Sequence, residues 1–318
     1  MGPGPLLGAA WWLLLGALTS GLATLLVLGR RNLRLGRGDK KGTVRLAGVL
    51  FVSSTLGLML RADHVPSLLD EWSLVINNMF SQTLLWSVLI WISYLALEPI
   101  ARRRWPELLI SWSRLLAGRF RDPLVGCDVL LGALAGIALA LVVHLGVVAP
   151  SWFGLPPRAP RVPVLTTLAA SRHLGFFFLN SLSFSVFFSL GGLFGLFFYR
   201  ALLRNRWLAL SLQFFLQYVL FAALLSNFGE LRSVSAALFT VIWFAVLLRA
   251  GLLASVVSFC FFRMLEATPL TLDLSAWYAG RTLLSLGFLG AVLIYGFWVS
   301  LGGKSPFGHS LFEGEGEG

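Results

Sequence analysis

The sequence predicts an all-helical integral membrane protein, and three observations support that fold class. Hydrophobic residues make up 57% of the chain and charged residues 12%, whereas soluble domains carry roughly 25% charged residues. Apolar runs of about 20 residues, long enough to cross a bilayer as a helix, recur along the chain. Lysine and arginine collect in the short loops between these runs. A chain with so little polar surface requires lipid as its solvent.

The first half of the chain contains four apolar runs that qualify as spans. Residues 6–28 form the first, and because the chain lacks the cationic start of a signal peptide, we interpret this run as a true span. Residues 46–60 are fewer, and Arg61 at their end is expected to reach the interface with its guanidinium. The third run covers 74–97, and the fourth covers 129–149 between prolines.

The second half is expected to contain five spans, of which the first is unusually rich in phenylalanine. One long apolar stretch exceeds a simple span and carries Arg249 near its middle, so we expect two short helices that meet at this arginine. The resulting total is about nine spans, or eight if Arg249 lies within one tilted helix. The expected ranges are 176–199, 207–225, 236–248, 250–265 and 283–301.

These spans form a single predicted transmembrane domain, residues 1–306, followed by an acidic tail at 307–318 that is expected to be disordered. The loops after the first, third, fifth and seventh spans, together with the tail, hold about 18 of the 25 lysines and arginines. Arginine-rich short loops stay in the cytoplasm. We therefore expect a multi-pass protein of the bacterial inner membrane, with its N-terminus outside and its C-terminus in the cytoplasm.

The most basic loop reads RRNLRLGRGDKKGTVR at residues 30–45 and includes Arg31, Arg34 and Arg37. Its glycines superficially resemble a phosphate-binding loop, but the spacing from Gly36 to Gly42 is one residue too long and no lysine precedes the threonine. A loop anchored at both ends in lipid is also a poor nucleic-acid arm. The sequence favours a topology determinant that touches anionic lipid headgroups, without nucleic acid.

A second basic segment, residues 102–128, follows the third span. It begins with Arg102, Arg103 and Arg104, and its apolar residues, including Trp112, then recur at a spacing of three to four, with Arg114 among them. This pattern is typical of an amphipathic helix that lies in the membrane interface. It is either a linker helix or a surface that docks a cytoplasmic partner domain.

Small and polar residues are the remaining features of the spans. The Gly132-x-x-x-Gly136 and Gly191-x-x-x-Gly195 patterns allow close helix contact, more often within a chain than between chains.

Polar groups at membrane depth are functional candidates. For each of them an ordinary structural role is also open: a snorkelled anchor for the central arginine, a hydrogen-bonded helix residue for the histidine, and pairing with Arg102 or Arg103 for the glutamate. The candidates are Arg249, His144, Gln213, Gln217 and Glu98.

Catalytic and cofactor motifs are absent from the sequence. It contains no HExxH, GxSxG or DxD motif, and no histidine has a second histidine at metal-ligand spacing. The two cysteines, Cys127 and Cys260, are far apart and form no CxxC pair. We therefore expect a protein that is not an enzyme and that needs no cofactor or metal.

Four stretches resemble one known family. They read RNLRLGRGD at Arg31–Asp39, YLALEP at Tyr94–Pro99, RRRWPELLISWSRLLAGRFRDPLVG at Arg102–Gly126 and TPLTLDLSAWYAGR at Thr268–Arg281. Together they are similar to the C-terminal multi-span membrane module of bacterial, acidobacterial-type serine/threonine protein kinases. The resemblance covers most of the chain and implies a protein kinase domain as partner. It implies no kinase activity here, because the Gly-rich loop, HRD and DFG motifs are missing.

The functional hypothesis that follows is a membrane-embedded anchor or sensory module of a kinase signalling system. The alternative is a small-solute or lipid transporter, which would line a mid-membrane cavity with Arg249, Gln213, Gln217 or His144. An intramembrane enzyme is a weaker alternative, because it would need ionisable groups clustered at one depth.

Overall fold

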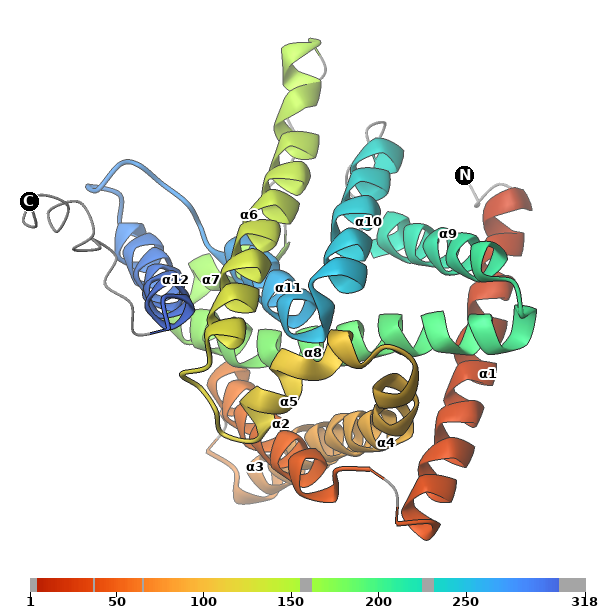
Figure 1. Cartoon of the computed structure of the whole chain (residues 1–318). Coiled ribbons are helices and arrows are strands. Elements are labelled where there is room, and N and C mark those ends of the chain that lie inside the picture. Colours follow the sequence, from red (N-terminus) through yellow and green to blue (C-terminus); the bar gives the residue numbers. More distant parts are fainter. Residues whose placement is uncertain (1–4, 37, 65, 155–161, 225–231, 303–318) are drawn as a thin grey trace, which may run out of the picture.

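The computed structural model describes residues 5–36, 38–64, 66–154, 162–224 and 232–302, and these residues form helices and connecting turns without a strand. Figure 1 shows α8 running across the middle of the molecule, with α6, α9 and α10 on one side of it and α2, α3 and α4 on the other. The elements are α1 (Pro5–Arg34), α2 (Lys40–Arg61), α3 (Leu68–Ser73), the π-helix η1 (Leu74–Phe80), α4 (Ser81–Arg104), the 3-10 helix η2 (Pro106–Leu109), α5 (Ile110–Leu116), α6 (Pro123–Trp152), α7 (Val162–Ala169), α8 (Ser171–Leu203), α9 (Arg206–Leu224), α10 (Arg232–Arg249), α11 (Gly251–Ala267) and α12 (Ala279–Ser300).

Among the described residues, six helical segments are long and apolar enough to cross a membrane. The all-helical class and the membrane character of the chain are thereby confirmed, whereas the count of nine spans stays a prediction. Within α10, Ser233–Arg249 is a shorter apolar helix, and α11 has 17 residues. The predicted tail at 307–318 lies outside the described residues. The six segments are Lys40–Arg61, Leu68–Arg104, Pro123–Trp152, Ser171–Leu203, Arg206–Ala223 and Ala279–Ser300.

A helix break lies where the sequence places one, at Arg249-Ala250-Gly251. α10 ends at Arg249 and α11 begins at Gly251, whose φ of 85° is a left-handed conformation that glycine adopts without strain. A Cβ atom at Gly251 would lie 2.7 Å from the carbonyl oxygen of Leu108. The break therefore lets the chain turn sharply against η2, and a glycine is required there for both reasons.

The interior is dominated by aromatic side chains that surround α8. The ring of Phe188 stacks on Phe259 with centroids 4.5 Å apart, and Phe221 meets Phe239 edge to face at 4.4 Å. Trp243 of α10 is fully buried in the same cluster. Aromatic pairs of this kind contribute about 0.5–1.5 kcal/mol each beyond their burial. The phenylalanine-rich segment at 176–199 is therefore the centre of the fold.

Glycines allow close contact between helices. Of the two predicted small-residue patterns, the first makes such contacts at both glycines and the second at one. α11 makes its most extensive contact with α6. A Cβ at Gly132 would lie 2.6 Å from the Ala254 carbonyl, and one at Gly136 would lie 2.5 Å from the Ser258 carbonyl. The second pattern differs, because Gly191 faces open space, while Gly195 lies against the side chain of Gln213.

The connections between helices form two groups, and the segments within each group are linked by hydrogen bonds. We call residues 30–45 and 102–122, apart from residue 37, the basic surface. Arg45 of α2 donates to the Leu116 carbonyl at 3.4 Å, and Tyr295 of α12 donates to the Phe120 carbonyl at 2.6 Å.

In the second group, Arg172 bonds Asp63 at 2.5 Å and Thr167 donates to the Ala267 carbonyl at 2.7 Å. Arg281 donates to the Leu168 carbonyl at 2.8 Å. Helices α2 and α4 run between the two groups, as membrane helices that connect opposite faces would.

His64 in the second group is placed to respond to pH. Its Nδ1 lies 2.6 Å from Oε1 of Glu71, and its Nε2 lies 3.1 Å from the Met59 carbonyl oxygen. The hydrogen bond to Glu71 raises the pKa of His64 above its ordinary value of 6.5. Because the folded pKa is the higher one, this contact stabilises the link between α2 and α3 at low pH and is lost as the pH rises through that value.

We expect an NMR titration of the purified protein to give His64 a pKa above 6.5, and Glu71→Gln to return it toward 6.5. Glu107→Gln, which removes an exposed acid on the basic surface, is the matched control and should leave the titration of His64 unchanged. The same His64 titration in the wild type and in Glu71→Gln would contradict the assignment of the shift to this pair.

Candidate functional site

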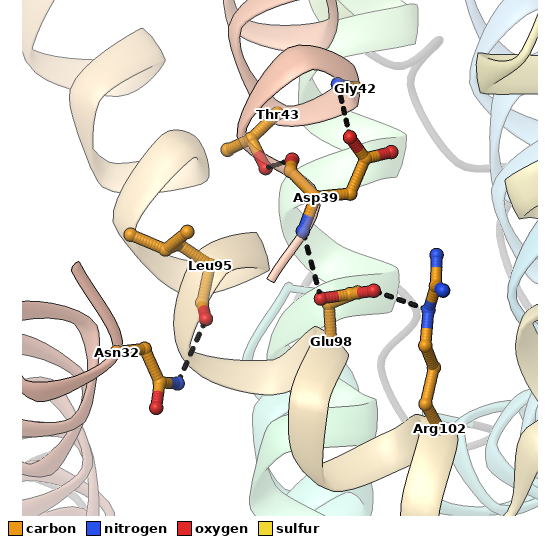
Figure 2. A network of polar contacts seen from close by, with 7 residues as sticks. All are labelled: Asn32, Asp39, Gly42, Thr43, Leu95, Glu98 and Arg102. Atoms are coloured by element: carbon orange, nitrogen blue, oxygen red, sulfur yellow. Dashed lines mark hydrogen bonds and ion pairs between the residues drawn. The ribbon is translucent and has the colours of Figure 1, made fainter. Parts of the chain in front are cut away.

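Glu98 is a buried carboxylate at the centre of a polar network on the basic surface (Figure 2). It is 2% exposed. One carboxylate oxygen accepts a hydrogen bond from the backbone N–H of Asp39 at 3.1 Å, and the other forms an ion pair with Nε of Arg102 one helical turn further on. The sequence anticipates pairing with Arg102 or Arg103, and the structure selects Arg102. Burying a carboxylate is costly unless it is paired and hydrogen-bonded, as it is here.

The partner of Glu98 in the first basic loop is held in place by helix capping. Asp39 is the N-cap of α2, and its Oδ1 accepts from the N–H of Gly42 at 2.8 Å. The Thr43 hydroxyl donates to the Asp39 carbonyl at 2.5 Å. Gly38 precedes this cap with a φ of 99°, and a Cβ there would lie 3.1 Å from a Glu98 oxygen. Residues 38–43 are therefore held against α4 by these contacts.

Pro99 creates the second connection of the network. A proline has no N–H, so the carbonyl four residues earlier, that of Leu95, receives no hydrogen bond within α4. Asn32 of α1 supplies the missing donor, with its Nδ2 3.0 Å from the Leu95 oxygen (Figure 2). The same Nδ2 lies 3.4 Å from the Ala96 oxygen. Asn32 is itself buried. The end of α1 is thereby fastened to the proline turn of α4.

The segment after Pro106 corrects one expectation. Trp112 was expected on an interfacial surface, but it is 3% exposed and packs with Leu108 and Leu109 in the protein core. The apolar face predicted from the spacing exists, but it is covered by protein and not by lipid. Arg102, Arg103 and Arg104, which precede this segment, are exposed, as are Arg119 and Arg121 at its end.

Arg114 closes this segment onto the start of α6. Its Nη1 lies 2.7 and 2.8 Å from the two carboxylate oxygens of Asp122, which is the N-cap of α6. The guanidinium holds the pKa of the Asp122 carboxyl below its usual value. Bonds of this kind between ionised groups are shorter and stronger than neutral ones. The basic surface is therefore internally cross-linked at both of its segments.

The other candidate residues do not form a common site among the described residues. Arg249 is exposed at the end of α10, and His144 is exposed on α6, where its Nδ1 donates to the Ala140 carbonyl at 2.7 Å. Gln213 and Gln217 are buried and bond each other on α9 at 3.5 Å. None of these four lines any of the four cavities described for this chain.

Two of the three arginines predicted in the first basic loop are exposed. Arg31 and Arg34 are exposed near the end of α1, and Arg37 lies outside the described residues. Sequence reasoning missed Asn32, although Pro99 inside an apolar helix indicates an unpaired carbonyl at Leu95 that some donor must reach. Asp39 was equally missed, although an aspartate three residues before a glycine-threonine pair is typical of a helix N-cap.

The class of protein that these features define is a helical membrane protein with a cross-linked basic surface. The described residues contain no group of three or more His, Cys, Asp or Glu side chains that could hold a metal ion. Comparison with protein-family models, with curated proteins and with solved structures finds no match.

Proposed function

We propose that this chain is a non-catalytic module of the bacterial inner membrane that anchors, and senses for, a serine/threonine kinase signalling system. The basic surface is the part that would face a kinase domain in the cytoplasm. The observation that carries the proposal is the connection at Glu98, which joins the two basic segments into one unit (Figure 2).

Three of the four stretches that resemble the kinase-linked module meet in this unit. Asp39 lies in the first stretch, Glu98 in the second, and Arg102 begins the third. Arg45 adds a further bond, to the Leu116 carbonyl at 3.4 Å. A surface built from several segments changes shape as a unit when the helices behind it shift, which a sensory module requires.

Site-specific photocrosslinking tests the proposal. A photoreactive amino acid at Arg121, which is exposed on the basic surface, should capture a protein that carries a kinase domain in native membranes. The same probe at Leu272, which is fully exposed in the second group of connections, is the matched control and should not. Kinase products from Leu272 alone, or from neither position, would contradict the proposal.

A further inference from the structure

A cavity of about 640 Å³ lies between α1, α4 and α8, next to the Glu98 network. Its wall is apolar and consists largely of aromatic and aliphatic side chains. Its polar lining is concentrated at the ends of α1 and α4, where three arginines contribute to it. The wall includes Leu28, Ile100, Phe194, Phe197, Phe198 and Leu202, and the arginines are Arg31, Arg103 and Arg104.

The charge around this cavity is uncompensated within the described part of the chain. Glu98, which directly precedes the lining residue Pro99, is already engaged by Arg102 and by the N–H of Asp39. Each of the four described ion pairs uses other cations, namely His64, Arg102, Arg114 and Arg172. Three guanidinium groups thus share one cavity without a carboxylate partner, which is a site for an anion.

The combination of an apolar wall and a cationic rim specifies the kind of anion. Guanidinium groups bind phosphate through paired hydrogen bonds, and phenylalanine side chains pack against hydrocarbon. A free phosphate would use the arginines and leave the wall empty. An acidic phospholipid uses both, because its headgroup carries the charge and its acyl chains extend along the helices. Basic pockets between membrane helices are known to select such lipids.

We propose that this cavity binds one acidic phospholipid, with its phosphate on Arg31, Arg103 and Arg104 and an acyl chain against Phe194 and Phe197. The site does not depend on a kinase partner. Because Asn32 and Pro99 also line the cavity, the bound lipid would touch the contact that fastens α1 to α4.

Lipid binding to the purified chain in detergent is the test, with native mass spectrometry or thermal shift as readout. The probes are phosphatidylglycerol, phosphatidylcholine and inorganic phosphate. We expect phosphatidylglycerol to bind in preference to phosphatidylcholine. R31Q/R103Q/R104Q should weaken its binding by roughly 100-fold, since each cationic side chain near an acidic headgroup contributes about fivefold. R119Q/R121Q/K41Q removes the same charge from exposed positions outside the cavity and should change it little.

A second variant separates the cavity from its charges. Ala201 is exposed and lines the cavity, so Ala201→Trp fills the space and keeps all three arginines. We expect it to reduce phosphatidylglycerol binding while the protein stays folded by circular dichroism. Equal binding of the two lipids to the wild type, an equal loss in the two triple variants, or an equal shift with inorganic phosphate alone would overturn the proposal.

Discussion

Replacing Gly136 by alanine should destabilise the protein by about 2–3 kcal/mol, the upper range for overpacked interiors. A Cβ at this position would lie 2.5 Å from both the Phe261 Cβ and the Ser258 carbonyl oxygen of α11. The carbonyl belongs to a helix backbone and cannot rotate away, so α6 and α11 must separate. This interface is the most extensive helix contact of the fold, and its loss should lower the free energy of unfolding measured in mixed micelles.

Gly287→Ala on α12 is the matched control. It makes the same substitution inside an apolar helix, and no atom of a neighbouring helix lies within 4 Å of the added Cβ. It should be neutral or stabilising by up to about 1 kcal/mol, because alanine favours the helix over glycine. If Gly136→Ala and Gly287→Ala changed stability alike, the two helices would not be in the close contact described here.

Much of the fold could be predicted from the sequence, because lipid imposes a simple rule on it. Backbone polar groups must be satisfied internally in a bilayer, so long apolar runs become helices. The break at Arg249-Ala250-Gly251 was predictable from a charge and a glycine in one run. The number of spans was not, because length and apolarity do not say whether helices such as α10 and α11 each cross the membrane.

Contacts over long sequence distances were beyond prediction. The spacing of Gly191 and Gly195 says that the two glycines share a face, but not which neighbour covers it, and only Gly195 meets one. The spacing around Trp112 likewise predicts an apolar face without saying whether lipid or protein covers it.

Within the candidate site, too, local contacts were predictable from the sequence and long-range contacts were not. Glu98 and Arg102 are four residues apart in one helix, so their pairing followed from local geometry. The bond from the N–H of Asp39 to Glu98 depends on how α2 and α4 pack, and no local pattern encodes it.

Removing the hydrogen bond between Asn32 and the Leu95 carbonyl should also lower the free energy of unfolding strongly. Asn32→Ala should cost about 1–2 kcal/mol, because it leaves a buried carbonyl without a donor. Pro99→Ala restores a backbone N–H to α4, which can then bond the same carbonyl within the helix. In the Pro99→Ala background, Asn32→Ala should therefore cost less than about 0.5 kcal/mol, and a double-mutant cycle of unfolding free energies measures the difference.

Two further variants restrict the explanation of that cycle to the missing donor. Asn32→Asp keeps the size of the side chain but replaces the amide donor by an acceptor, so it should destabilise at least as much as Asn32→Ala. Pro150 is also a proline inside a helix, on α6. It lies near the end of α6 opposite to Asp122 and the basic surface, whereas Asn32 is in the basic surface, so the effects of Pro150→Ala and Asn32→Ala should simply add. Equal coupling of Asn32 to both prolines would show that Asn32 acts through general packing and not through the Leu95 carbonyl.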